Sequence, residues 1–218
     1  MLPSEHMPTP NPLPASGLSS GSVRTALYGV VAIGGSAGGI QALITLLSAL
    51  PAEFPLPILV VQHLPPNPLL PSMLPDILGK RTALSVKWAQ DGEAMVPGTV
   101  YVAPPDRHLL VAPLRRLALS SAARIGRWRP AVDALFQSAA EVFGEGAIAI
   151  VLSGMLWDGA KGISAVGRCG GITIAQDERT SGYFEMPSAA LDLGRADLVM
   201  SPRRIAQALE ILAALTSV

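Results

Sequence analysis

The hydrophobic residues of this chain follow two spacings that alternate along it. Continuous apolar runs occupy residues 29–33, 58–62 and 147–152, and such runs are typical of strands buried on both faces. Across residues 40–47 apolar side chains instead recur every three or four positions, which is the spacing of one helix face. Because strand-like and helix-like segments alternate, we predict an α/β fold with a doubly wound, mostly parallel sheet flanked by helices.

Later segments extend the same pattern. Ser201 followed by Pro202 is a good helix start, because it offers an N-cap and then a proline at the first helical position. The other predicted elements are helices at residues 69–80 and 131–143, a helix after Asp158-Gly159, and strands at residues 172–175 and 197–200.

One stretch in the middle of the chain is rich in turns. Short strands are predicted at residues 84–89, 99–103 and 108–112, joined by turn sequences at Asp91-Gly92 and Pro97-Gly98. We expect these strands to form a short antiparallel excursion from the main sheet.

Residues 1–24 have a composition unlike the rest of the chain. Five prolines between Pro3 and Pro14 are followed by a serine- and glycine-rich stretch at residues 16–22. Such a segment lacks both regular hydrogen bonding and apolar side chains for a core. We therefore expect residues 1–24 to be a flexible tail or linker and residues 25–218 to form one folded domain.

The overall composition is that of a globular protein. The 16 basic and 16 acidic residues give a formal net charge of zero, without an overall bias toward nucleic acid or an anionic membrane surface. Cys169 is the only cysteine, so no disulfide forms within the chain, which suits a reducing cytosol. No apolar run is long enough to cross a bilayer, and the N-terminus lacks a secretory pattern. We expect a soluble cytoplasmic protein that neither binds nucleic acid nor inserts into a membrane.

A glycine-rich turn follows the first predicted strand. Residues 34–39 contain four glycines around one hydroxyl, Ser36, and residues 34–38 match the G-x-S-x-G nucleophile elbow. A sharp strand-to-helix turn would lift the Ser36 hydroxyl to the carboxyl end of a sheet and leave free N–H groups at the helix start. A phosphate-binding G-x-G-x-x-G pattern would need glycine in place of Ser36. The turn alone leaves open whether Ser36 is a nucleophile or an incidental serine.

Polar residues stand at the ends of three predicted strands. Ser36, His63 and Asp158 could serve as nucleophile, base and orienting acid, since active sites of parallel sheets gather beyond the carboxyl ends of strands. Each also has an ordinary structural interpretation, as a turn residue or a helix N-cap. The order Ser, His, Asp differs from that of α/β-hydrolases, in which the histidine comes last.

The sequence contains a second candidate for the base and no pattern typical of a metal site. His108, with Asp76 or Asp91 as its acid, is the alternative to His63. No pair of histidines has metal-ligand spacing and one cysteine cannot build a thiolate site, so we expect no metal and no cofactor.

Several motifs occur together in the order typical of one family. They resemble the catalytic domain of the bacterial chemotaxis methylesterases (CheB), the protein-glutamate methylesterases, over about residues 29–205. The motifs are Ile33-Gly34-Gly35-Ser36-Ala37-Gly38-Gly39, Gln62-His63, Asp91-Gly92-Glu93, residues 101–108, Arg129-Pro130-Ala131-Val132-Asp133, Leu152-Ser153-Gly154-Met155 with Asp158-Gly159, Gly170-Gly171 with Ala175-Gln176-Asp177, and Met186-Pro187.

The resemblance implies a specific reaction and site. Family members hydrolyse glutamyl methyl esters on the cytoplasmic domain of methylated chemoreceptors to glutamate and methanol. By position, Ser36 matches the nucleophile, His63 the general base and Asp158 the orienting acid. The backbone N–H of Met155 matches the oxyanion contact, and the general elbow rule adds the N–H of Ala37 as a second donor.

The sequence departs from the family pattern in three places. Full-length chemotaxis enzymes carry an N-terminal receiver domain that is not present in this sequence, so we expect no control by phosphorylation within the chain. A separate receiver or chemosensory kinase is a possible partner. Trp157 stands where a small polar residue is usual, and Tyr183-Phe184-Glu185 replaces common small residues before Met186. These changes bear on substrate preference more than on reaction type.

Two other functions remain open from sequence. One is a non-catalytic ligand- or nucleotide-binding module that uses the turn at residues 34–39 as an anion cradle. The other is a chemosensory partner protein that keeps the fold without turnover. The identity of the receptor, glutamine deamidation and the oligomeric state are also left open.

Overall fold

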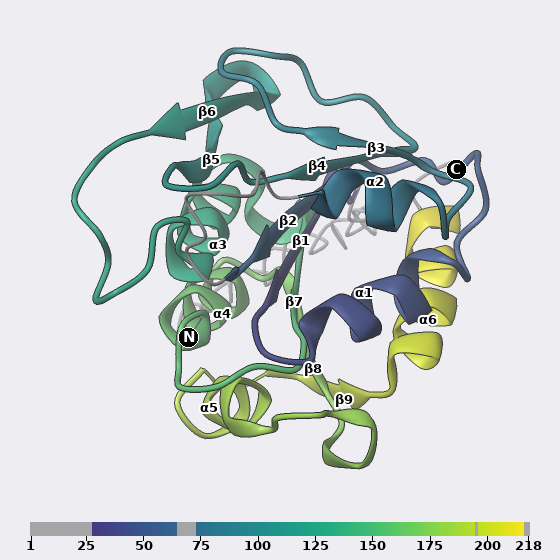
Figure 1. Cartoon of the computed structure of the whole chain (residues 1–218), viewed down its shortest axis with the longest axis vertical. Helices are drawn as coiled ribbons and strands as arrows, with labels where there is room; N and C mark the ends of the chain where they lie inside the picture. The colour runs from purple at the N-terminus through teal and green to yellow at the C-terminus, as the bar shows by residue number, and fades with distance from the viewer. Residues whose placement is uncertain (1–27, 65–72, 195, 216–218) are drawn as a thin grey trace, which may run out of the picture.

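Seven parallel strands form the centre of the computed structural model, which describes residues 28–64, 73–194 and 196–215 (Figure 1). Their order across the sheet is β3-β4-β2-β1-β7-β8-β9, and every neighbouring pair is parallel. The strands are β1 (Val30–Gly35), β2 (Ile58–Gln62), β3 (Ser85–Trp88), β4 (Thr99–Val102), β7 (Ala147–Val151), β8 (Ile172–Gln176) and β9 (Leu198–Met200).

Helices cover both faces of this sheet, which makes it doubly wound. The helices α1 (Gly39–Leu47), α2 (Leu74–Gly79) and α6 (Pro202–Ala214) contribute to one hydrophobic core. The helices α3 (Val132–Phe143), α4 (Ala160–Arg168) and α5 (Glu185–Asp192) contribute to the other core. Three short 3-10 turns are η1 (Pro113–Arg115), η2 (Gly144–Gly146) and η3 (Glu178–Thr180).

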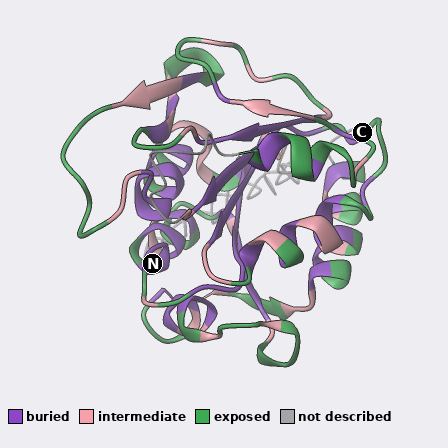
Figure 2. Cartoon of the chain, in the orientation of Figure 1, coloured by how far each residue is buried: buried purple, intermediate pink, exposed green. Residues whose placement is uncertain are grey.

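The two cores explain the continuous apolar runs in the sequence. Along β1, Val31 and Ile33 face the first core, whereas Val30 and Ala32 face the second. Side chains of a strand alternate between the two faces of its sheet, so a strand covered on both faces needs an apolar residue at every position. The central strands are accordingly buried from end to end (Figure 2).

A small second sheet lies outside the main one. Strand β5 (His108–Ala112) pairs antiparallel with β6 (Arg116–Ser120), a strand that sequence reasoning missed. Leu109 and Leu117 from this hairpin join the second core beside α3. The predicted antiparallel excursion therefore exists, but it begins later in the chain than expected.

The strands predicted at residues 84–89 and 99–103 belong to the parallel sheet instead. β3 and β4 pair parallel with each other, and β4 pairs parallel with β2. Two turns separate β3 from β4, with Gly92 and Gly98 at φ 73° and 70°. Two successive reversals restore the original direction of the chain, which is why these strands run parallel.

Some of the remaining predictions are confirmed by the structure, and others concern residues that it does not describe. The α/β class and the doubly wound, mostly parallel sheet are confirmed. The predicted tail at residues 1–24, and residues 65–72, where the helix predicted at 69–80 would begin, lie outside the described residues. Helix α5 was not predicted. Within the described ranges, no helix has both the length and the apolar character needed to cross a membrane.

The position of the site follows from the point at which the strand order of the sheet reverses. The chain runs from β1 to β2 on one side, and later enters β7 on the other side of β1. In open parallel sheets, a crevice forms beyond the carboxyl ends of the strands at such a switch point. The segments after β1, β2 and β7 therefore meet at one edge.

Packing between β1 and α3 leaves no room for a side chain at Gly34. A Cβ there would overlap the Cγ atoms of Val132, the first residue of α3. We expect Gly34→Ala to lower the free energy of unfolding by about 1–3 kcal/mol, the usual cost of overpacking a core, measured by urea denaturation.

Gly79→Ala is the matched control, because a Cβ there meets Val86 only at 3.8 Å. Its unfolding free energy should change by less than about 1 kcal/mol. An equal loss of stability in both variants would contradict the packing argument.

Candidate active site

The turn after β1 holds Ser36 in place through its backbone. Gly38 has a φ of 77°, a left-handed conformation that favours glycine, and it begins α1 as the N-cap. The Ser36 N–H donates to the Ser153 carbonyl at 3.0 Å, and the Ser36 carbonyl accepts the Gly39 N–H at 2.9 Å. The turn is therefore fixed to the segment that follows β7.

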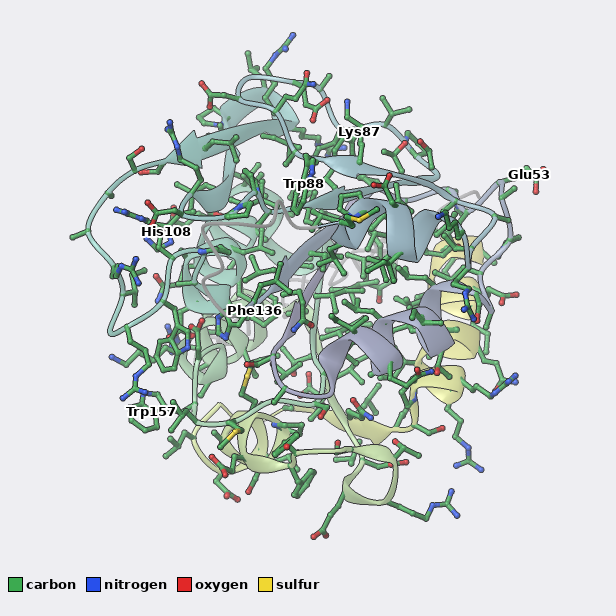
Figure 3. The ribbon with its side chains drawn as sticks, viewed as in Figure 1. Glu53, Lys87, Trp88, His108, Phe136 and Trp157 are labelled. Carbon is green, nitrogen blue, oxygen red and sulfur yellow. The ribbon has the colours of Figure 1, made fainter. Side chains whose placement is uncertain are left out.

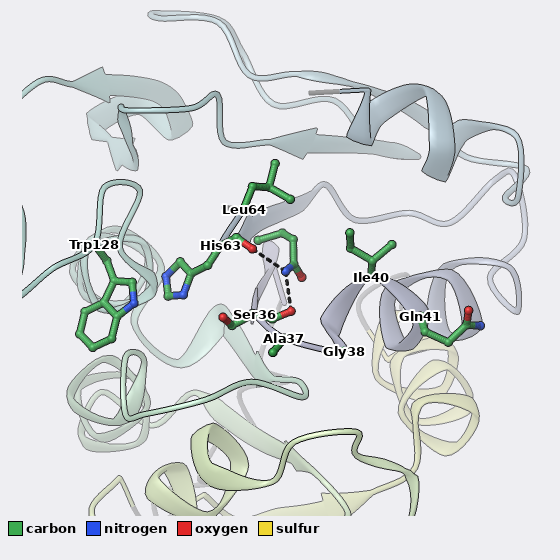
Figure 4. A pocket seen from close by; sticks show the side chains of 9 residues that line it. Ser36, Ala37, Gly38, Ile40, Gln41, His63, Leu64 and Trp128 are labelled. Carbon is green, nitrogen blue, oxygen red and sulfur yellow. Dashed lines mark hydrogen bonds between the residues drawn. The ribbon is translucent and has the colours of Figure 1, made fainter. Parts of the chain in front are cut away.

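Gln62, the last residue of β2, ties the serine to the histidine. Its buried side-chain Nε2 donates to the Ser36 carbonyl at 2.7 Å and to the His63 carbonyl at 2.9 Å (Figure 4). A Cβ at Gly39 would overlap the Gln62 Oε1, so a glycine is required where this amide crosses the turn. Sequence reasoning named Gln62 only as part of a motif and missed this role.

His63 and Asp158 form the central polar contact of the site. The imidazole Nε2 and the carboxylate Oδ2 are 2.8 Å apart, and the Asp158 side chain is fully buried. A carboxylate only accepts hydrogen bonds, so Nε2 carries the proton in this pair. The Nδ1 atom is then the free basic nitrogen, and it is buried with no hydrogen-bond partner among the described residues.

The Ser36 hydroxyl points toward this imidazole within the same pocket (Figure 4). The pocket has a volume of about 710 Å³. It is lined by Ser36, Ala37, Gly38, Ile40, Gln41, Gln62, His63, Leu64 and Trp128. The structure thus brings Ser36, His63 and Asp158 to one edge of the sheet.

Two aspartates hold the starts of α3 and α4 in a reciprocal arrangement. Asp158, just before α4, accepts the N–H groups of Val132 at 2.7 Å and Asp133 at 3.0 Å, at the start of α3. Asp133 in turn accepts the N–H groups of Gly159 at 3.0 Å and Gly162 at 2.8 Å, at the start of α4. Helix starts carry unpaired N–H groups and a partial positive charge, so each carboxylate complements the other helix.

Burial changes the pKa of the Asp133 carboxyl, the second of these two groups. Asp133 is buried, and desolvation raises the pKa of its carboxyl above the ordinary value, although the Gly162 and Gly159 N–H groups act in the opposite direction. Asp133 therefore contributes to the site indirectly, by fixing the loop that carries Asp158.

Two backbone N–H groups beside Ser36 are free to receive a hydrogen-bond acceptor. Over the described ranges, neither the Ala37 N–H nor the Met155 N–H donates a hydrogen bond within the protein. Gly154 lies against the serine, since a Cβ at Gly154 would come within 2.9 Å of the Ser36 Cβ. The Ser153 hydroxyl donates to the Ala37 carbonyl at 2.8 Å and so joins the two segments.

An aromatic pair covers the outer side of the histidine. The Trp128 ring stacks on the His63 imidazole, with ring centroids 5.6 Å apart and an interplanar angle of 13°. Trp157 contacts Trp128 edge-on at 6.0 Å, and its side chain lies at the outer edge of the molecule (Figure 3). Trp157, the unusual residue before Asp158, thus supports the ring that stacks on His63.

The alternative base, His108, has a structural role. Its Nδ1 accepts the Ala131 N–H at 3.2 Å, and its Nε2 lies 3.2 Å from the Ala123 carbonyl. Because both ring nitrogens are occupied by backbone groups, neither is free for a serine. The fallback assignment of His108 with Asp76 or Asp91 is therefore wrong. Asp91 instead accepts the Leu119 N–H at 2.8 Å.

Sequence reasoning missed the supporting residues Gln62, Trp128 and Asp133. Two of them left a signal, because Gln62 is a polar residue in an otherwise apolar strand and Asp133 is a carboxylate beside the apolar face of α3. Trp128 left none, since its contact with His63 joins segments 65 residues apart in the chain.

A parallel α/β sheet that gathers a serine, a histidine and an aspartate at one edge has the side chains of a serine hydrolase, an arrangement found on several unrelated folds. Comparison with known proteins narrows this class. The family model for CheB methylesterase matches residues 31–209. The chain therefore belongs to the CheB methylesterase family.

Individual relatives agree with this membership. A Myxococcus xanthus protein named protein-glutamate methylesterase/protein-glutamine glutaminase 4 is 41% identical over 173 residues, which cover 79% of this chain and 48% of that protein. A Leptospira interrogans protein with a putative name of the same kind is 36% identical over 180 residues, which cover 83% of this chain and 92% of that protein. The chain thus spans about half the length of the Myxococcus relative.

A solved structure extends the comparison to the fold. The crystal structure of the Thermotoga maritima CheB methylesterase catalytic domain matches with a TM-score of 0.80 and 39% identity. The match covers 85% of this chain and 98% of that domain, so the two share one architecture over nearly the whole of the solved domain.

Asp133 offers a test of the reciprocal arrangement through pH. Its carboxyl has a raised pKa in the folded protein, so its ionisation opposes folding. The stability linked to this group is complete below the unfolded value of 3.8 and is lost as the pH rises through the folded pKa. As the pH rises through this range, we expect the unfolding free energy of the parent to fall relative to that of Asp133→Asn. Urea denaturation at a series of pH values measures both free energies.

Asp133→Ala is the companion variant. It leaves the buried N–H groups of Gly159 and Gly162 without their acceptor, which should cost about 1–3 kcal/mol, whereas the amide oxygen of Asn can still accept them. A difference between Asp133→Asn and the parent that stays constant, or moves in favour of the parent as the pH rises, would refute this account.

Proposed function

We propose that this protein is a protein-glutamate methylesterase. It hydrolyses glutamyl methyl esters on the cytoplasmic domain of chemoreceptors to glutamate and methanol, in chemotaxis or a related chemosensory pathway. One observation carries the proposal: in a member of the CheB methylesterase family, a histidine bonded to a buried aspartate has its second nitrogen free beside a serine. We take residues 25–218 as the catalytic domain and the cytoplasm as its location.

The first half of the reaction follows from these contacts. The His63 Nδ1 accepts the proton of Ser36 as its Oγ attacks the ester carbonyl carbon. Asp158 accepts the hydrogen bond from the Nε2–H throughout and stabilises the imidazolium that forms. The negative charge that develops on the carbonyl oxygen is held by the free N–H groups of Ala37 and Met155.

The second half regenerates the enzyme. The imidazolium returns its proton to the departing methoxide, which leaves as methanol, and Ser36 carries the acyl group. Water then attacks this acyl-enzyme with His63 as the base, and free glutamate is released. The two imidazole nitrogens exchange the roles they have in the usual Ser-His-Asp template, in which Nδ1 faces the aspartate.

The nucleotide-binding alternative has weaker support. An anion cradle needs several unpaired N–H groups in the turn. The Ser36 N–H donates to Ser153 and the Gly39 N–H donates to Ser36, so two of the turn's donors are already used within the protein. Of the donors that remain, the Ala37 N–H adjoins Ser36, where the oxyanion of an ester would develop.

Removal of the proposed nucleophile is the direct test of turnover. We expect Ser36→Ala to lower hydrolysis of a methylated receptor fragment by a factor on the order of 10⁶, because the acyl-enzyme cannot form. Methanol release measures the rate, and circular dichroism reports whether the fold survives.

A fluorophosphonate probe separates an active esterase from a partner protein without turnover. It should label the parent and the control Ser48→Ala, which replaces the exposed serine that caps the end of α1, but not Ser36→Ala. Unchanged methanol release from Ser36→Ala, or a parent that neither labels nor hydrolyses, would sink the proposal.

The stacked tryptophan should affect the rate through the base. We expect Trp128→Ala to lower kcat for a small ester about two- to tenfold with little change in KM, because the stacking that fixes the His63 ring is worth about 0.5–1.5 kcal/mol. Steady-state kinetics with p-nitrophenyl acetate measures both constants.

Trp128→Phe keeps a ring over the imidazole and should recover most of kcat. Trp157→Ala removes only the edge contact to Trp128, so its loss should be smaller. A defect in Trp128→Ala that Phe does not repair would argue against stacking as the cause.

A further inference from the structure

Positive charge is concentrated in one segment of this neutral chain. Residues 105–130 contain six arginines and a single acidic residue, Asp106, whereas the chain as a whole has a formal net charge of zero. This segment includes the β5–β6 hairpin and the connection from β6 to α3. We call residues 121–130 of that connection the arginine loop.

Polar contacts at its base hold the arginine loop in a defined shape. His108 binds the Ala123 carbonyl and the Ala131 N–H, near the two ends of the loop. Arg129 donates to the Ser121 and Ala122 carbonyls, each at 3.0 Å. These contacts leave little freedom for the loop to collapse onto the protein surface.

Asp106 gathers the arginines of the loop around one carboxylate. Arg129 contacts it at 2.8 Å and Arg124 at 3.3 Å. The hydrogen bond from Arg129 and the charges of Arg129, Arg124 and Arg107 lower the pKa of the Asp106 carboxyl below its usual value. One negative charge therefore faces several positive ones, and the group keeps a net positive charge.

The tip of the loop meets the active site. Ile125 and Trp128 exchange backbone hydrogen bonds at 3.1 Å across a two-residue turn, with Gly126 at a φ of 60°. The same Trp128 stacks on His63 and lines the pocket. Arg127, next to it in the chain, is therefore at the rim of the site.

Two arginines of this group have guanidinium groups that form no hydrogen bond within the described residues. The side chains of Arg107 and Arg127 are exposed and, over the ranges that the structure describes, form no hydrogen bond. Exposed apolar side chains lie on the neighbouring loop after β7, where Met155 is 44% and Trp157 is 55% exposed. At the rim, the positive charge of Arg127 thus lies in the chain beside Trp128, and apolar contact area lies on the neighbouring loop, a combination found on protein-binding surfaces.

We propose that the arginine loop, with Arg107, is a docking surface for an acidic protein face that surrounds the target ester. This inference rests on the proposed function, because it concerns the substrate of the same site. Each ester that is hydrolysed leaves a glutamate carboxylate, so a substrate with several target residues becomes more negative as it is processed. A cationic rim attracts such a face, and arginine binds carboxylates in a planar, two-point geometry.

The consequence for catalysis is a preference set by the residues around the ester. A charged rim raises the encounter rate with an oppositely charged partner about tenfold or more at low ionic strength, and salt screens this gain. The chemistry at Ser36 is separate from this effect, so a small neutral ester does not depend on the rim in the same way.

Two synthetic peptides of equal length test this preference. Each carries one glutamyl γ-methyl ester, flanked by glutamates in one peptide and by lysines at the same positions in the other. We expect the parent protein to hydrolyse the glutamate peptide with about tenfold higher kcat/KM at low ionic strength. In roughly 0.5 M salt this advantage should largely disappear.

Charge reversal locates the effect on the protein. In the double variant Arg107→Glu with Arg127→Glu, the preference should invert toward the lysine peptide. The change in the ratio of kcat/KM between the two peptides should exceed any change in kcat/KM for p-nitrophenyl acetate. The matched control is Arg203→Glu with Arg204→Glu, two exposed arginines of α6, which packs in the other core. The control should keep the parent's preference.

Four results would overturn the inference in distinguishable ways. Equal hydrolysis of both peptides by the parent, or a preference that survives the reversal, refutes the docking surface while the esterase stands. Equal hydrolysis together with Arg127-dependent binding of a DNA duplex or of phosphatidylserine vesicles assigns the rim to another partner. A parent that hydrolyses neither the peptides nor p-nitrophenyl acetate removes the proposed function itself.

Discussion

The contact between the Asp158 carboxylate and the His63 imidazole is the interaction around which this structure is arranged. The carboxylate reaches the imidazole only because it is anchored from behind by the first N–H groups of α3. Those N–H groups have no partner within their own helix, so α3 supplies donors that a buried carboxylate requires. The start of a helix on one face of the sheet thereby determines the orientation of a ring at the end of β2.

Further hydrogen bonds fix the segments around this contact. Asp133 complements the start of α4 and fixes the loop that carries Asp158, while Gln62 and Ser153 join the backbone of the Ser36 turn to its neighbours. Most polar groups around the pocket are thus satisfied by fixed partners. Within the described ranges, the His63 Nδ1 and the N–H groups of Ala37 and Met155 have no partner, and these are atoms that ester hydrolysis would use. The Gln62 Oε1 is also buried there without a hydrogen bond to any described residue.

Trp128 and Arg127 are neighbours in the connection from β6 to α3. Trp128 stacks on His63 from the tip of the arginine loop, and Arg127 beside it faces solvent. A rigid loop of this kind can hold the base in position and present charge to a partner at the same time. The family architecture is shared with the Thermotoga domain, and surface loops are in general the segments that vary most between proteins of one fold.

The α/β class, the parallel sheet and the three strand ends that meet at one edge could all be predicted from the sequence, because burial of a strand on both faces imposes an apolar run that is visible in one dimension. The sequence also pointed to Ser36, His63 and Asp158, since each lies within a few residues of the end of such a run. It could not decide which imidazole nitrogen faces Asp158, that His108 is a backbone clamp, or that Trp128 covers His63. Each of these points depends on contacts between segments that are distant in the chain, so it became visible only in the folded protein. The direction of β4 likewise results from two consecutive reversals of the chain. Each turn sequence predicts one reversal, but neither shows that the two together make β4 parallel to β3.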